Sequence, residues 1–565
     1  MISKALLIAP ALVVLLALTP VRAQAPHSAP EGLEPLIRRF QTDEDGLNQF
    51  YNAAFSPVVQ KRFVAFRSEW RKTLDSLDYG KLDTEARVDW LLLDGYLKHE
   101  EAQAALAAKR EAQMLPLVPF APKLVALEEA RSRVEPPDGE RFATTLDTIL
   151  QEIKATRTEE RTIAPTLALR TARALDSLAR TLATWYAHYD GFHPLVTWWC
   201  KTPYEAVQRE LTDYSRTLRE DVARVKGRDD DPLIGDPIGR DALLADLAHE
   251  RIPYSPEELV QIANREFAWC EAELKKATKE LGLGEDTKAA LARVKAHHAA
   301  PGEQDALVAG QAREAIAFLQ ARDLVTLDPL CLETWRLQMS NRDVQKSLPF
   351  AAYGGQKMLV AYPLETMDHA DKAMSLRANS ENFTRIVTPH ELIPGHHLQG
   401  FMSERYRPYR QGFQTPFLVE GWALYWEMEL WDKGWARGPE DRIGMLFWRM
   451  HRCARILVSL GFHLGTMTPD QMIDFLVERV GHERFAATSE VRRYIGGGYS
   501  PLYQCAYMIG GLQLRALSKE QVEGKRRTPK QFHDAILHEG PIPVELIRTA
   551  LTDSRPAKTA PFWRF

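Results

Sequence analysis

Residues 255–281 read SPEELVQIANREFAWCEAELKKATKEL, and this stretch decides the fold class. Ser255 is a hydroxyl N-cap, Pro256 suits the first helical turn, and Glu258 completes a capping box. The apolar residues that follow keep the spacing of one helix face, and they are Leu259, Ile262, Ala263, Phe267 and Leu274. Gly282 then offers a stop. The stretch therefore predicts a long amphipathic α-helix.

The same helical period extends along the chain in both directions. Upstream, amphipathic runs predict helices over 85–110, 142–156, 163–190 and 203–226. Downstream, predicted helices begin at Thr415-Pro416, near Ile443, at Thr468-Pro469 and at Ser500-Pro501, and the last is expected to end near Gly510-Gly511. Residues 357–362, between two glycines and a proline, have the best strand pattern. We predict a mainly α fold with a small β element.

The composition is that of a large globular protein. The chain has 565 residues, of which 26% are charged and 45% are hydrophobic. Since no Gly-, Ser- or Pro-rich linker divides the sequence, residues 26–565 are expected to form a single helical catalytic domain, with its motifs in 350–515. The net charge of -4 and the lack of a long basic run argue against a nucleic-acid partner.

The N-terminus has the layout of a signal peptide. Lys4 lies in a short positive region, residues 5–19 form an apolar core, and Val21-Arg22-Ala23 supplies small residues for cleavage. The apolar run is short for a membrane span, so the mature form is expected to have no integral membrane segment. No cysteine lies directly after the apolar core, which argues against a lipid anchor. We predict that residues 1–23 are removed and that the protein is periplasmic or secreted.

The cysteines give no sign of a metal ribbon or a disulfide framework. Their number is odd and their spacing matches no zinc motif. We interpret all of them as buried thiols: Cys200, Cys270, Cys331, Cys453 and Cys505.

Residues 388–397, TPHELIPGHH, contain the groups that a zinc hydrolase needs. Imidazole nitrogens hold the metal, and a carboxylate beside them activates water. The stretch departs from H-E-x-x-H because position 394 is proline and the next histidine is His396. Pro394 and Gly395 must therefore break or bulge the helix, or else the second histidine would rotate off the metal-facing side. The alternative is that Glu391 only completes a capping box and the histidines are structural.

A third metal ligand is predicted on the apolar stretch 417–427, FLVEGWALYWE. An unpaired Glu420 on the inner face of such a helix would bear a large desolvation cost, which a metal ion removes. Glu427 lies near the same face and is expected to hold a ligand histidine in its tautomer from the second coordination shell. In the alternative interpretation, Glu420 is a solvated position on an amphipathic helix.

These motifs resemble the bacterial domain-of-unknown-function family 885. Further matching segments are Gly461-Phe462-His463, Glu490–Tyr494 and Pro501–Gly510. That family is grouped with gluzincin-type zinc metallopeptidases, relatives of angiotensin-converting enzyme and the thermostable carboxypeptidases. The resemblance implies a large α-rich metallopeptidase-like fold that holds one zinc ion per chain in a deep cleft.

The resemblance also bears on the choice of ligands. In angiotensin-converting-enzyme-like enzymes the second histidine and the ligand glutamate are 24 positions apart, which is the separation of His396 and Glu420. We therefore expect His390, His396 and Glu420 to bind zinc, with His397 as the alternative to His396.

The expected reaction uses zinc to polarise a carbonyl and to activate water, with Glu391 as the general base. Tyr507, which matches a tyrosine of the family, is the first choice as hydrogen-bond donor to the oxyanion. Tyr503, His463 and Arg493 are further candidate catalytic donors. Alternatively, the two tyrosines form a core stripe and Arg493 only pairs with an acid on a solvated face.

Two departures from the family pattern affect specificity. The segment Pro501–Gln504 reads Pro-Leu-Tyr-Gln where many members have Pro-Gly-Gln-Ala, in the region expected to bind the oxyanion. Pro389 disfavours an uninterrupted helix at Thr388.

The strand over 357–362 is expected at a sheet edge, where it either pairs with a peptide or is only structural.

The leading hypothesis is an exported zinc metallopeptidase for short peptides, acting as a dipeptidase, carboxypeptidase or aminopeptidase by analogy with its relatives. One rival is a zinc hydrolase of non-peptide amides or esters, which would use the same residues. Another is a non-catalytic peptide-binding protein with a vestigial site.

Overall fold

The computed structural model describes residues 32–225, 232–346 and 348–565. The predicted signal peptide, residues 1–23, lies outside the described residues. In the first half of the chain the helices are α1 (Glu34–Phe50), α2 (Pro57–Asp75), α3 (Thr84–Met114), α4 (Ala121–Ser132), α5 (Gly139–Thr158), α6 (Pro165–Tyr189), α7 (Pro194–Thr217), α8 (Arg240–His249), α9 (Pro256–Glu280), α10 (Thr287–Ala296) and α11 (Gln304–Arg322).

The second half contains a small sheet among further helices. The helices are α12 (Pro329–Thr334), α13 (Arg342–Gln345), α14 (His369–Ala378), α15 (Glu381–Glu391), α16 (His396–Ser403), η4 (Pro408–Phe413), α17 (Pro416–Asp432), α18 (Pro439–His463), α19 (Pro469–Phe475), α20 (Arg484–Ile495), α21 (Tyr503–Ser518), α22 (Pro529–His538) and α23 (Val544–Thr552). The strands are β1 (Leu337–Met339), β2 (Ala351–Gly354) and β3 (Lys357–Val360). The predicted mainly α class with a small β element is confirmed.

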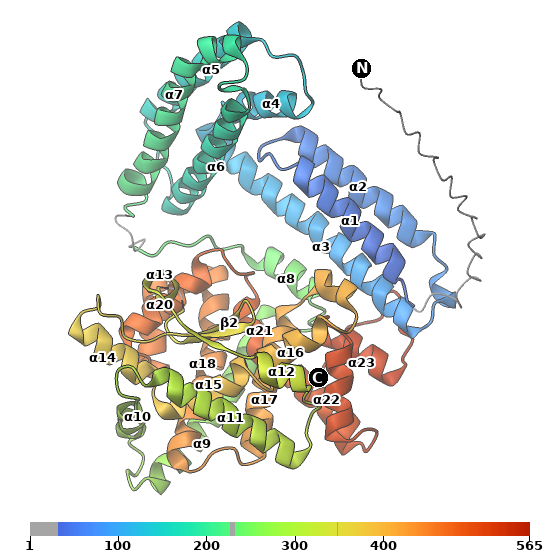
Figure 1. Cartoon of the computed structure of the whole chain (residues 1–565), viewed down its shortest axis with the longest axis vertical. Helices are drawn as coiled ribbons and strands as arrows, with labels where there is room; N and C mark the ends of the chain where they lie inside the picture. Colours follow the sequence, from blue (N-terminus) through green and yellow to red (C-terminus); the bar gives the residue numbers. More distant parts are fainter. Residues whose placement is uncertain (1–31, 226–231, 347) are drawn as a thin grey trace, which may run out of the picture.

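Helices α4–α7 stand together at the upper left of Figure 1 and α1–α3 lie beside them at the upper right, both above the larger assembly built from α8–α23. The α4–α7 bundle encloses its own apolar cluster, which includes Leu146 and Trp185. A second cluster joins α1–α3 to α17, α22 and α23 through residues such as Phe40 and Trp426. A third packs α9, α18 and α21 against the sheet.

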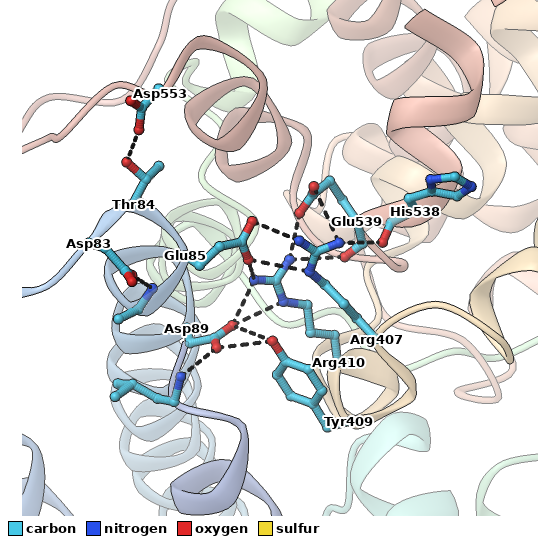
Figure 2. Close-up of polar contacts among 12 residues, drawn as sticks. Asp83, Thr84, Glu85, Asp89, Arg407, Tyr409, Arg410, His538, Glu539 and Asp553 are labelled. Atoms are coloured by element: carbon cyan, nitrogen blue, oxygen red, sulfur yellow. Dashed lines mark hydrogen bonds and ion pairs between the residues drawn. The ribbon is translucent and has the colours of Figure 1, made fainter. Parts of the chain in front are cut away.

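A buried ionic network also fastens α3 to the second half of the chain (Figure 2). Arg410, on η4, pairs with Asp89 of α3 at 2.8 Å and with Glu539 at 2.7 Å. Glu85 accepts from both Arg410 and Arg407. The side chains of Arg410 and Asp89 are completely buried, so this network positions η4 against α3.

Most predicted helices are present, with corrected ends. The capping box of Ser255 and Glu258 opens α9 as expected. The helix predicted over 203–226 instead begins at Pro194 and keeps Pro203 inside α7. The helix predicted to end near Gly510-Gly511 continues to Ser518, because these glycines allow close helix packing rather than a stop.

The expected interruption of the helix at Thr388 is wrong. Thr388 and Pro389 both lie inside α15, which begins after Ser380, so the capping-box alternative for residues 388–391 is excluded as well. Proline at 389 removes the donor that the carbonyl of Arg385 would otherwise receive. Trp435 donates its indole N–H to that carbonyl at 3.2 Å and satisfies it.

The sheet has the order β1-β3-β2, with β1 parallel and β2 antiparallel to β3. The predicted strand at 357–362 is therefore the central strand β3, and the expectation that it forms an edge is wrong. The edge beside the predicted reactive residues is β2, a short segment without strong β-forming residues apart from Tyr353.

Two smaller expectations concern the cysteines and the membrane. All five cysteines are free thiols and buried, as predicted. Among the described helices, none is long and apolar enough to cross a membrane.

Candidate metal centre

The chain breaks between α15 and α16 and brings His390 and His396 together. His390 and Glu391 end α15, and His396 opens α16, so the predicted break at Pro394-Gly395 is present. A Cβ atom at position 395 would overlap the carbonyl oxygen of His390, so only glycine allows this return of the chain. The rings of His390 and His396 lie with centroids 4.9 Å apart and nearly perpendicular.

Glu420, from the middle of α17, completes the group. Its Oε2 lies 3.2 Å from Nε2 of His396 and 3.6 Å from Nε2 of His390. Glu420 is only 4% exposed, so its interpretation as a solvated position is excluded. Glu391 is adjacent, since His390, Glu391 and His396 each offer a ligand atom within 4.8 Å of the others.

The tautomers suit a cation at this point. Nδ1 of His390 donates to Oε1 of Glu427 at 2.6 Å, which leaves Nε2 of a neutral ring as an acceptor. That lone pair faces Oε2 of Glu420, a buried atom with no hydrogen-bond partner among the described residues. Acceptors that face one another in a buried place need a proton or a metal ion between them. Two imidazoles and a carboxylate fit zinc, so the residues present match the predicted ion.

The electrostatics favour positive charge here. Burial alone would lower the pKa of His390, but the neighbouring carboxylates of Glu420 and Glu427 raise it to about 9. Burial would raise the pKa of Glu420, yet the two neighbouring imidazoles hold it well below its usual value. Glu427 behaves similarly, because Arg452 and His390 outweigh burial and lower its pKa.

His397 faces away from this group. Its Nδ1 lies 3.1 Å from the hydroxyl of Tyr353 and its Nε2 lies 3.1 Å from the carbonyl oxygen of Cys331. Both ring nitrogens are therefore used outside the cluster, and the geometry favours His396 over His397 as the ligand.

Close packing of α17 on α21 sets the opposite wall. A Cβ at Gly510 would overlap the carbonyl oxygen of Phe417, and one at Gly421 would lie 2.6 Å from the carbonyl carbon of Gly510. The two backbones can approach this closely only because both positions are glycine. This contact brings Tyr503 and Tyr507 of α21 up to Glu420.

The two tyrosines have different partners. The hydroxyl of Tyr503 donates to Oε1 of Glu420. The ring of Tyr507 stacks on His390 with centroids 6.2 Å apart, and its hydroxyl donates to no described residue. Burial, followed by the charge of Glu420, raises the pKa of Tyr507 to about 12, so it stays a donor at neutral pH. Both tyrosines line a cavity rather than only the core.

The other two predicted donors, Arg493 and His463, differ in whether they line the cavity. Arg493 lines the same cavity and pairs with Glu490 at 3.0 Å, with its side chain only 8% exposed, so it does not lie on a solvated face. His463 is not among the cavity-lining residues; it ends α18, and the charged groups that influence its pKa are Asp246, Arg110 and Asp236. Its burial lowers that pKa to about 4.

A cavity of about 490 Å³ opens over the His/Glu group. Strand β2 borders it, as do Gln411 and Gln414 next to the α3 network. Arg452 and Arg455 of α18 also line it, and the sequence analysis did not single them out. A signal in the sequence could have found them: Arg455 lies within the largely apolar stretch CARILVSL, and Arg452 directly precedes that stretch. A charged side chain in such a stretch is costly to bury, so it indicates a special role.

Comparison with solved structures shows what this fold resembles. A candidate lipoprotein of unknown function from Shewanella oneidensis has a TM-score of 0.68 at 17% identity, over 91% of this chain and 98% of its own. A candidate lipoprotein from Colwellia psychrerythraea has a TM-score of 0.56 at 14% identity, over 92% and 97%. At this identity the likeness shows the fold alone.

Comparison with sequences identifies the family. No curated protein matches the chain. Residues 45–551 match the family described as bacterial protein of unknown function (DUF885), which includes the helices of the His/Glu group and most of the chain around them. The chain therefore belongs to the DUF885 family.

Proposed function

We propose that this protein is an exported zinc-dependent metallopeptidase that hydrolyses short peptides. The observation that supports it most is the convergence of His390, His396 and Glu420 on one point, with Glu391 beside them, at the floor of a cavity. Three ligands with an open side are the pattern of a catalytic zinc site, as in gluzincin-type enzymes.

Zinc bound by these residues would supply a Lewis acid that polarises the scissile carbonyl and lowers the pKa of a water molecule. Glu391 takes the proton of that water and returns it to the leaving amine. The free hydroxyl of Tyr507 donates to the developing oxyanion. Tyr503 and Glu427 hold the ligands Glu420 and His390 in place through their hydrogen bonds.

Strand β2 supports a peptide as the substrate. Ala361 donates to the carbonyl of Phe350 at 2.7 Å, which makes this a hydrogen-bonded pair of the β2–β3 ladder. By alternation, the backbone N–H and C=O groups of Ala351 and Tyr353 point to the free edge. These residues line the cavity, so an extended peptide can add there as a further strand.

Export is supported by the signal-peptide layout of residues 1–23 and by the description of two structural neighbours as candidate lipoproteins. The neighbours' descriptions favour a cell-envelope location, which suits a peptidase that acts on short peptides outside the cytoplasm. The predicted absence of a lipid anchor stays a prediction.

The test measures zinc and activity on the same preparation. Elemental analysis should find about one zinc per chain, and a library of short peptides should be cleaved. Glu391→Gln should lower kcat by about 10²- to 10⁴-fold with zinc content unchanged. Zinc-loaded protein that cleaves non-peptide amides or esters but no peptide would favour the rival hydrolase. Full activity in Glu391→Gln would exclude Glu391 as the base.

A further inference from the structure

The cavity contains more positive charge than the proposed peptidase reaction uses. Arg452, Arg455 and Arg493 all line it, and their side chains are only 4–8% exposed. Such a concentration of buried guanidinium groups is costly unless each one is paired.

Their pairing inside the protein is incomplete. Glu490 accepts from Arg455 at 2.9 Å and from Arg493 at 3.0 Å, so one carboxylate serves two guanidinium groups. Arg452 reaches Glu427 at 3.2 Å, but Glu427 already accepts from His390. Three cations therefore share two carboxylates. Glu427 also accepts from His390, and Glu490 also accepts from the hydroxyl of Tyr494 at 2.6 Å.

Several donor atoms are left without partners. Nε of Arg452, Nη1 of Arg455 and Nε of Arg493 are buried and have no hydrogen-bond partner among the described residues. The side chains of all three arginines border the cavity. An anion that entered the cavity would therefore meet guanidinium groups whose N–H donors are not all used.

The arginines lie close to the reaction centre. The guanidinium of Arg455 lies 4.3 Å from the ring centroid of Tyr507, and that of Arg452 lies 4.9 Å from it. Tyr507 itself stacks on His390. An anion held by this group would therefore belong to the molecule whose bond is cleaved.

We propose that Arg493, together with Arg452 and Arg455, binds a carboxylate of the peptide substrate. The planar guanidinium fork matches a carboxylate in two-point geometry, which suits this anion. The carboxylate is either the free C-terminus or an acidic side chain near the scissile bond. This inference rests on the proposed peptidase function and names its substrate class.

Binding to an inactive variant tests the inference apart from catalysis. Zinc-loaded Glu391→Gln protein is titrated with Ala-Ala-Ala as the free acid, with its C-terminal amide, and with Ala-Ala-Glu amide. We expect the free acid to bind about 10- to 100-fold more tightly than its amide, as one or two charge-assisted hydrogen bonds would give. Tight binding of Ala-Ala-Glu amide alone would identify the side chain as the source.

The residue assignment is tested by adding Arg493→Gln to that variant. The preference for the acid should be lost, while the amide should bind as before. If Arg493→Gln is poorly folded, Arg493→Lys serves in its place. This change keeps the charge opposite Glu490 and should retain part of the preference for the acid. The matched control is Arg484→Gln on the same helix, where Arg484 is exposed and pairs with Asp474.

The outcomes separate the two proposals. Equal binding of acid and amide overturns the carboxylate site even if peptides are cleaved. A preference that survives Arg493→Gln overturns the assignment of Arg493. Protein that holds no zinc and binds none of the peptides overturns the carboxylate site together with the peptidase function.

Discussion

At the scale of single residues, the two adjacent histidines differ in what their nitrogens face. His396 points its Nε2 at Glu420, whereas both nitrogens of His397 are used by Tyr353 and Cys331. We expect His396→Ala to lose stoichiometric zinc and all activity, because two ligands do not hold a catalytic zinc. His397→Ala should keep about one zinc per chain, as measured by elemental analysis after dialysis. Loss of zinc in His397→Ala alone would reverse the ligand assignment.

Substitutions of the two tyrosines are expected to have different effects on kcat and on zinc affinity. Tyr507→Phe removes a donor with no other partner, so kcat should fall by about 10²- to 10³-fold while zinc affinity is unchanged. Tyr503→Phe removes the hydrogen bond to Glu420, so zinc affinity should fall by about 10- to 100-fold. Chelator competition and steady-state kinetics on both variants measure this difference. The same pattern in both variants would contradict the assignment.

At the scale of elements, the contact between α17 and α21 holds the site together. Glu420 lies one residue before Gly421 on α17, and Tyr507 lies three before Gly510 on α21, so a change in helix spacing moves both functional groups. The glycines are thus structural requirements of the site, although neither bears a reactive group.

Gly510→Ala should push the helices apart. Overpacking of this kind costs about 1–3 kcal/mol, and zinc should be lost as Glu420 moves. Gly310→Ala is the control, because a Cβ at this position of α11 meets nothing within 4 Å. That change should instead stabilise the protein by about 0.5–1 kcal/mol. Urea unfolding of the two variants checks the opposite signs, and a neutral Gly510→Ala would show that the helices can relax.

At the scale of the whole molecule, the network around Arg410 joins distant parts of the chain (Figure 2). Arg410 and Asp89 are 321 positions apart, and both are completely buried. Burial raises the pKa of Asp89, although Arg410 opposes this effect. Asp89 therefore depends on Arg410 to remain an anion in the interior.

Arg410→Met should destabilise the protein by about 3–5 kcal/mol, since it leaves buried carboxylates without their cation. Arg515→Met removes a half-exposed pair with Asp432 and should cost less than about 1 kcal/mol. Chemical denaturation compares the two. Asp89→Asn in the Arg410→Met background should recover part of the loss, because it removes the stranded charge. Equal effects of the two arginine changes would show that the network is dispensable.

The sequence alone was sufficient for the class of fold and for singling out residues that come together at the candidate site, among them His390 and Glu420. Helical period and capping boxes are local, so α9 and the break at Pro394-Gly395 followed from neighbouring residues. Glu420 could also be singled out from the sequence, because it is a charged residue in an apolar stretch. An unpaired buried charge is costly wherever the helix lies.

Only the tertiary structure decided which groups meet. It showed that His396, and not His397, faces Glu420. It also showed that β2, and not β3, is the free edge of the sheet, and that His463 is not among the cavity-lining residues. It also brought Arg452, Arg455 and Arg493 together from two helices. A sequence pattern reports the period within one element, whereas the direction of a side chain depends on how elements pack. Gly510 and Gly511 of α21 show this, since they look like a helix end in sequence and are a contact with α17 in the fold.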